Sequence, residues 1–165
     1  MDHRILSHQQ IVHKINRIAY QIYEANVEEE VIILAGIAGG GLDLAKKLKK
    51  ALEKICQAQI QLCTVKMDKS NPLESGVTTT LKPEAYQGRS VVVIDDVLKS
   101  GSTLIYGVHH FLKTPVKLLK TAVLVDRNYK RFPIKADFKG LSLSTSMEEH
   151  VHVDFSPRNY GVYLD

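Results

Sequence analysis

Four short apolar runs, each followed by a turn or a helical pattern, constrain the fold of this chain more than any other feature. We predict strands from these runs at residues 31–35, 60–67, 91–95 and 116–126. Helical spacing of apolar residues predicts helices over about 8–25, from Leu42 onward and over 102–113. Because strand and helix alternate, the fold class should be α/β, with a mostly parallel twisted sheet flanked by helices and a small C-terminal region.

Length and composition narrow the class of protein further. A chain of 165 residues is long enough for one domain with a full core, so we predict a single domain over 1–165. Its 44% hydrophobic and 24% charged residues are typical of a globular protein. No apolar run approaches the roughly 18–20 residues that cross a bilayer, and the N-terminus carries no apolar leader. These features favour the cytoplasm and no membrane contact.

The stretch that carries chemistry begins where the third apolar run ends. Asp95 and Asp96 close that run, and Lys99-Ser100-Gly101-Ser102-Thr103 leads into the next helix. In an open α/β sheet, ligands bind beyond the carboxyl ends of the strands. The free N–H groups of a helix N-terminus favour an anion such as phosphate, and adjacent carboxylates suit vicinal hydroxyls or a hydrated Mg²⁺. A sugar phosphate would satisfy both halves, whereas the serines and threonine alone would indicate only a helix cap.

This stretch resembles the phosphoribosyl diphosphate signature of type I phosphoribosyltransferases, which have a Rossmann-like sheet. "VVVIDDVLKSGSTL" (residues 91–104) fits the signature throughout, with Ser100 in place of the usual threonine. The resemblance implies transfer of ribose 5-phosphate from phosphoribosyl diphosphate to a nucleobase, with release of pyrophosphate and Mg²⁺ as cofactor. It implies that Asp95 and Asp96 are catalytic, hold the ribose hydroxyls and lie near the metal, which binds mainly through the ligand. The 5′-phosphate loop would consist of Val97, Leu98, Lys99, Ser100, Gly101, Ser102 and Thr103.

The rest of the chain is similar to one branch of that family, the pyrimidine operon attenuators that double as uracil phosphoribosyltransferases (PyrR-type). This likeness favours uracil as the base. It implies that Ala38, Gly39 and Gly40 approach the pyrophosphate. It also implies that residues 68–89, rich in turn-forming residues, form a mobile flap over the site. Asp126 and Arg127 would lie on the base side, before a hood that reads the base.

This chain departs from the branch at two places, and these departures leave the function of the chain open. The pyrophosphate loop of the branch has Lys-Thr-Arg-Gly where this chain has Ala38-Gly39-Gly40-Gly41, so two cations are absent. After the second strand the branch has an arginine that this chain lacks, although Lys66 or Lys69 could partly substitute. The alternative to an active transferase is therefore a catalytically weak regulator that binds nucleotide or phosphoribosyl diphosphate, and RNA.

The charge of the chain bears on its partners. A net charge of +4 suits an anionic ligand and also suits RNA. The lysines of "KKLKKALEK" (46–54) lie opposite an apolar stripe, as on any solvated helix, and no aromatic residues interleave with them. RNA is thus a partner that the sequence allows but does not favour. By analogy with the family we expect a homodimer or a higher assembly.

Overall fold

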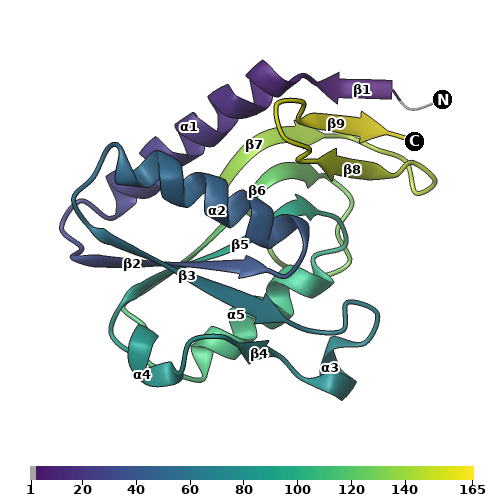
Figure 1. Ribbon diagram of the computed structural model, residues 1–165. Helices are drawn as coiled ribbons and strands as arrows, with labels where there is room; N and C mark the ends of the chain where they lie inside the picture. The colour runs from purple at the N-terminus through teal and green to yellow at the C-terminus, as the bar shows by residue number, and fades with distance from the viewer. Residues whose placement is uncertain (1–2) are drawn as a thin grey trace.

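A six-stranded sheet forms the centre of the computed structural model, which describes residues 3–165 (Figure 1). Its strands lie in the order β4-β3-β2-β5-β6-β7. Every neighbouring pair from β3 to β7 is parallel, and only β4 runs antiparallel to its neighbour. This confirms the predicted α/β class. The strands are β2 (Val31–Ile37), β3 (Gln59–Lys66), β4 (Thr78–Thr79), β5 (Ser90–Leu98), β6 (Leu118–Arg127) and β7 (Phe138–Leu143).

Helices cover both faces of this sheet. Successive side chains of a strand point to opposite faces, and in the central strands both sets are apolar, so each face must be covered. On one face, α1 (His8–Ala25) and α2 (Gly40–Glu53) pack their apolar stripes on Ile32, Leu34 and Val92. On the other face, α5 (Ser102–Leu112) packs on Ile33 and Val93. Within residues 3–165 no helix is long and apolar enough to cross a membrane.

Ser7 and Gln10 show why α1 begins where the sequence predicts. The Ser7 Oγ accepts the Gln10 N–H, and the Gln10 Oε1 accepts the Ser7 N–H, which completes a capping box. The predicted end of one strand and the predicted start of one helix were wrong. Strand β2 continues through Gly36 and Ile37, because both pair with β3, and α2 begins at Gly40 rather than at Leu42.

A second, three-stranded sheet stands at the end of the molecule where the central strands finish (Figure 1). It has the order β1-β9-β8, with all neighbours antiparallel. Both ends of the described chain lie in it, since β1 pairs with β9. Its inward side chains Leu6, Val151 and Val162 join the core under α1 and α2. The strands are β1 (His3–Leu6), β8 (Val151–Asp154) and β9 (Gly161–Leu164).

The segment 68–89, predicted to be a mobile flap, has secondary structure of its own. It contains α3 (Pro72–Ser75), β4 and α4 (Pro83–Tyr86). Tyr86 is fully buried and packs edge-on against Phe111 of α5, with 4.9 Å between the ring centroids. An anchored aromatic ring fixes the second half of the segment on the core. The second half of the predicted flap is therefore packed on the core.

Candidate active site

A pocket of about 390 Å³ opens at the carboxyl end of β5. The acid pair and the turn that follows it line one side without interruption, from Asp95 to Leu104. Lys69 from the loop after β3 and Val151–Val153 of β8 line the rest. The structure therefore brings together both predicted catalytic residues and every predicted member of the 5′-phosphate loop: Val97, Leu98, Lys99, Ser100, Gly101, Ser102 and Thr103.

The acid pair is held by the backbone of its own strand. The Asp95 Oδ1 accepts the Asp96 N–H at 2.9 Å, and the Asp96 Oδ1 accepts the Val97 N–H at 2.9 Å. Asp95 is only 5% exposed, whereas Asp96 is half-buried. Burial, with the charge of Asp96 added, raises the pKa of Asp95 from 3.8 to about 8, although the charge of Lys69 opposes this rise. An ionised Asp95 therefore needs a partner in the pocket, such as a cation or a hydroxyl donor.

This raised pKa predicts that stability falls as pH rises. The Asp95 carboxyl binds its proton more tightly in the folded protein than in the unfolded chain. The resulting contribution of Asp95 to the free energy of unfolding is therefore complete below about pH 4. That contribution should be lost progressively as pH rises toward 8. Urea unfolding at pH 5 and pH 8 measures it, with Asp95→Asn as the control that removes the titration. A wild-type protein whose Asp95-dependent stability grows over this interval would contradict the assignment.

The turn after the acids is braced from outside. Gly101 adopts a left-handed conformation with φ of 89°, and α5 begins at the next residue. The Ser100 carbonyl accepts the N–H groups of Arg131 and Phe132 at 2.8 and 3.1 Å. Because a Cβ on Gly101 would overlap Ile134 Cγ2, loop 128–134 packs directly on the turn. No pattern in the sequence predicts this brace, because it joins two segments that are far apart along the chain.

The second glycine-rich loop approaches the acids from the neighbouring strand. Ala38 donates its N–H to the Val65 carbonyl at 2.8 Å, and Gly39 caps α2. A Cβ on Gly40 would overlap Asp96 Oδ2, and one on Gly41 would stand 2.6 Å from the Ile94 carbonyl oxygen. The absence of side chains thus lets the start of α2 lie against the acid pair. Of the predicted pyrophosphate-loop residues, Gly40 therefore borders Asp96. None of Ala38, Gly39 and Gly40 is among the residues that line the pocket.

Asp126 and Arg127, predicted on the base side, end β6 and are buried. Lys130 and Lys139 place their Nζ atoms 3.5 and 3.6 Å from Asp126 Oδ2. Arg127 donates to Thr145 Oγ1 at 2.7 Å and to the Ser146 carbonyl at 2.9 Å. Neither residue is among those that line the pocket. They tie the loops after β6 and β7 to the sheet.

Strand β8 forms the wall that sequence reasoning missed. His150 and Asp165 exchange both backbone hydrogen bonds, at 3.0 and 2.9 Å, so the main-chain groups of Val151 and Val153 point away from β9. Since β8 is the edge of its sheet, no further strand pairs with these groups in the described part of the chain, and Val151–Val153 are among the residues that line the pocket. His152 is held 3.1 Å from Asp165 Oδ2 and stacks on Tyr163. The alternation in "VHVDF" was the available signal for this strand.

A protein-built metal cage is absent from the part of the chain that the structure describes, because no three His, Cys, Asp or Glu side chains cluster there. The carboxylates of Asp95 and Asp96 still fit Mg²⁺, which prefers hard oxygen ligands and often binds through one or two carboxylates plus substrate phosphates. This donor set agrees with a metal held mainly by the ligand.

Comparison with known proteins identifies the class to which this fold and pocket belong. Residues 2–158 match the model of the phosphoribosyl transferase domain family, and the chain belongs to that family. It therefore falls among the phosphoribosyltransferases, a class of glycosyltransferases that transfer a pentose. The match covers all the predicted site residues.

Among individual proteins, the chain is similar to those named bifunctional protein PyrR. The protein from Haemophilus ducreyi is 30% identical over 163 residues, which cover 93% of this chain and 89% of the relative. That from Streptococcus gordonii is 32% identical over 146 residues, covering 86% and 84%. A hypoxanthine-guanine phosphoribosyltransferase from Bacillus anthracis has the same fold, with a TM-score of 0.71 at 21% identity over 87% of this chain and 83% of that one.

Proposed function

We propose that residues 1–165 act as one domain that transfers ribose 5-phosphate from phosphoribosyl diphosphate to a nucleobase, with uracil favoured. The observation that carries this proposal is the unbroken run from Asp95 to Thr103 along one wall of the pocket. Asp95 and Asp96 would bind the ribose 2′- and 3′-hydroxyls, and the backbone and hydroxyls of Lys99–Thr103 would bind the 5′-phosphate. The start of α5 supports this orientation: Ser100 Oγ accepts the Ser102 N–H at 3.2 Å, whereas Gly101 has no side chain to cap the N–H groups that follow.

The reaction requires charge stabilisation more than covalent help. The bond from C1 of the ribose to the pyrophosphate oxygen breaks, and its electron pair leaves with pyrophosphate. A nitrogen of the base supplies the pair for the new bond to C1, and its proton leaves to water. Anchoring the 5′-phosphate and both hydroxyls holds C1 in place between base and leaving group. Mg²⁺, which would be held mainly by the substrate with Asp95 and Asp96 nearby, would neutralise negative charge on the departing pyrophosphate.

The open edge of β8 supports a pyrimidine base bound on the side of the pocket that Val151–Val153 line. Uracil presents an N–H flanked by two carbonyl oxygens, and the free main-chain N–H and C=O groups of Val151 and Val153 could match that pattern. Asp126 and Arg127 would act here indirectly, by fixing the loops after β6 and β7.

A panel of bases tests the proposed reaction. The protein is mixed with phosphoribosyl diphosphate, Mg²⁺ and one of uracil, cytosine, hypoxanthine, guanine or adenine, and pyrophosphate release is followed. We expect pyrophosphate release with uracil, and we expect Asp96→Asn to reduce its rate greatly. Release with a purine alone would overturn the base assignment, and no release with any base would overturn the transferase.

A weakly active regulator that binds nucleotide and RNA is the second candidate, and one observation favours it. Although no aromatic residues interleave with the helix lysines in sequence, rings from another segment lie beside one of them: Lys47 Nζ stands 4.7 Å from the Phe155 ring and 4.9 Å from the Tyr160 ring. Both rings come from the C-terminal hairpin, which packs beside α2. RNA binding that weakens steeply with salt and is reduced by Lys50→Glu would support this candidate. No binding at low salt would exclude it.

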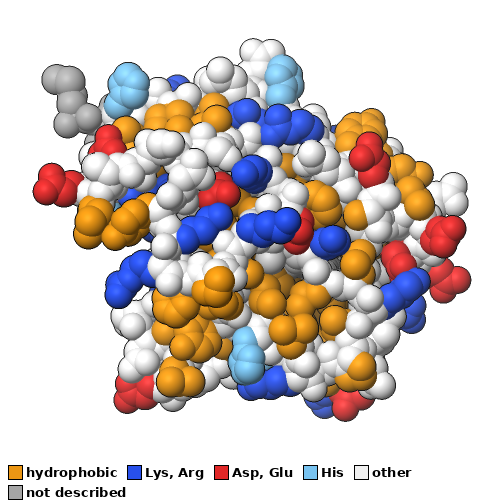
Figure 2. Space-filling model, turned by 180° about the vertical axis from the view of Figure 1, so that it is seen from behind, with side chains coloured by type: hydrophobic (Ala, Val, Ile, Leu, Met, Phe, Trp, Pro, Cys, Tyr) orange, Lys and Arg blue, Asp and Glu red, His pale blue; other side chains and the backbone are white. Residues whose placement is uncertain are grey.

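A homodimer or higher assembly is also proposed, supported by an apolar patch on the face shown in Figure 2. Hydrophobic side chains gather on the lower half of that face. Ile105, Tyr106, His109 and Phe132 surround a shallow hollow beside α5, and Leu112 on the same helix is 64% exposed. Light scattering should give at least twice the mass of the chain, and a monomer would contradict the proposal.

A further inference from the structure

The candidate pocket offers little positive charge where a diphosphate would lie. The loop Ala38–Gly40 supplies only backbone groups, and its helix starts against the carboxylate of Asp96. Transfer leaves additional negative charge on pyrophosphate, so a site that releases it must stabilise that charge. In this chain the neutralising group has to come from another element.

Lys69 is the side chain that meets this need. The basic side chains that line the pocket are Lys69, Lys99 and His152. Lys99 belongs to the turn itself, and His152 is already paired with Asp165. Lys69 comes from the opposite wall, and the ion pairs found within residues 3–165 do not include it.

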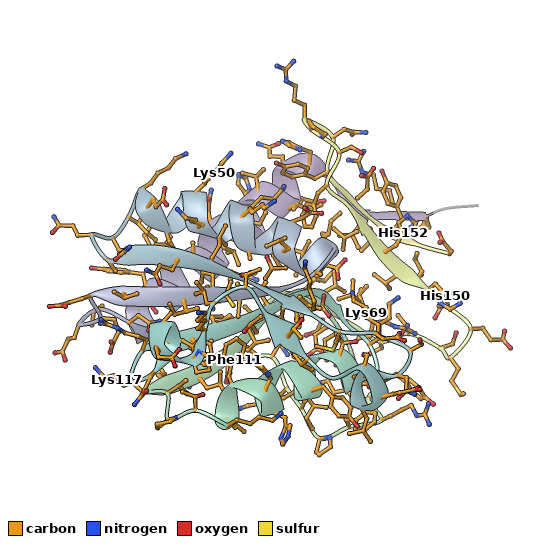
Figure 3. All side chains as sticks on the ribbon, turned by 60° about the horizontal axis from the view of Figure 1, so that its bottom comes forward. Lys50, Lys69, Phe111, Lys117, His150 and His152 are labelled. Atoms are coloured by element: carbon orange, nitrogen blue, oxygen red, sulfur yellow. The ribbon has the colours of Figure 1, made fainter. Side chains whose placement is uncertain are left out.

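The loop around Lys69 is built to present that side chain. The Asp68 Oδ1 accepts the Ser70 N–H at 3.0 Å and the Ser70 hydroxyl at 2.6 Å, so the neighbouring carboxylate is engaged within its own turn. The Asp68 N–H donates to Ser75 Oγ at 3.2 Å, which ties the turn to α3. Figure 3 shows Lys69 at the same end of the molecule as His150 and His152, with Lys117 at the opposite end.

We infer that Lys69 binds the diphosphate of phosphoribosyl diphosphate and the pyrophosphate product, and so supplies the charge that Ala38–Gly40 lack. The inference rests on the proposed function and assigns the part of the substrate that one residue contacts. A lysine suits this task because its ammonium is a compact charge on a flexible stem and can follow a departing group. Lys66, the other lysine of this region, ends β3 and is not among the pocket-lining residues.

Calorimetric titration of the full chain with three probes tests the inference. The probes are phosphoribosyl diphosphate, inorganic pyrophosphate and uridine 5′-monophosphate, each with Mg²⁺. Lys69→Met should weaken binding of the first two by about 10- to 100-fold, the loss expected for one charge-assisted contact. Uridine 5′-monophosphate, which lacks the diphosphate, should bind to Lys69→Met within about twofold of its affinity for wild type. Lys69→Arg should recover most of the affinity for the first two probes that Lys69→Met loses. Lys66→Met is the matched control and should bind all three as wild type does.

The outcomes separate this role from the proposed function. Equal weakening of all three probes by Lys69→Met, or equal losses in Lys66→Met, would overturn the assignment to the diphosphate. A wild-type protein that binds uridine 5′-monophosphate but neither diphosphate would overturn the role of Lys69 alone. A wild-type protein that binds none of the probes would overturn the proposed function together with it.

Discussion

Asp95→Asn should greatly reduce turnover and at the same time stabilise the protein at pH 8. The amide can still accept the Asp96 N–H, but it cannot accept a hydrogen bond as strongly from a ribose hydroxyl or bind a cation. We expect kcat/KM to fall by about 100-fold or more, the usual effect of removing one preorganised polar group. The neutral amide avoids the cost of burying a carboxylate, so stability should rise by about 1–2 kcal/mol.

Asp96→Asn is the matched control for this prediction. Asp96 is half-buried, so its replacement should reduce turnover comparably while changing stability little. Steady-state kinetics and urea unfolding at pH 8 measure both quantities on the same samples. An Asp95→Asn protein with full activity would contradict the site, and one with lower stability at pH 8 would contradict the electrostatic account of the pair.

Gly101→Ala should disrupt phosphate binding through the backbone rather than through charge. The residue must adopt φ of 89°, and its new Cβ would overlap Ile134 Cγ2 in the bracing loop. We expect a loss of about 1–3 kcal/mol of stability from strain and overlap. The turn must shift to relieve the overlap, so uridine 5′-monophosphate should bind about tenfold or more weakly.

Gly88→Ala separates strain from function in this experiment. Gly88 also has a positive φ, of 68°, but a Cβ there meets no atom within 4 Å and the residue lies outside the pocket. The control should therefore lose a little stability and no affinity. Adding Ile134→Ala to Gly101→Ala should recover part of the binding, and a Gly101→Ala protein that binds as well as wild type would contradict the proposed phosphate site.

The features predicted from the sequence were local ones. The spacing of Ile11, Ile15, Ile18 and Ile22 predicted α1, and the apolar run before Asp95 predicted a buried strand. The acid pair and its turn are contiguous in sequence, so their proximity required no knowledge of tertiary contacts. The family resemblance, carried by the same residues, was confirmed by the match to the phosphoribosyl transferase domain.

The features that were missed depend on contacts between distant segments. Periodicity cannot show that β8 closes the pocket, because its four residues pair with β9 and approach β5 only after the chain has folded. Likewise, Tyr86 lies in a stretch rich in turn-forming residues, and only its packing on Phe111 reveals that α4 is anchored. Lys66 and Lys69 looked equivalent in sequence, whereas the structure places only Lys69 at the pocket.

A crystal structure with phosphoribosyl diphosphate and Mg²⁺ bound tests the central claim most directly. The measurement is the position of the 5′-phosphate in electron density. We expect this phosphate to contact the backbone of Lys99–Thr103, with the ribose hydroxyls on Asp95 and Asp96. A 5′-phosphate bound at any other position, or ribose hydroxyls directed away from the acid pair, would contradict that claim.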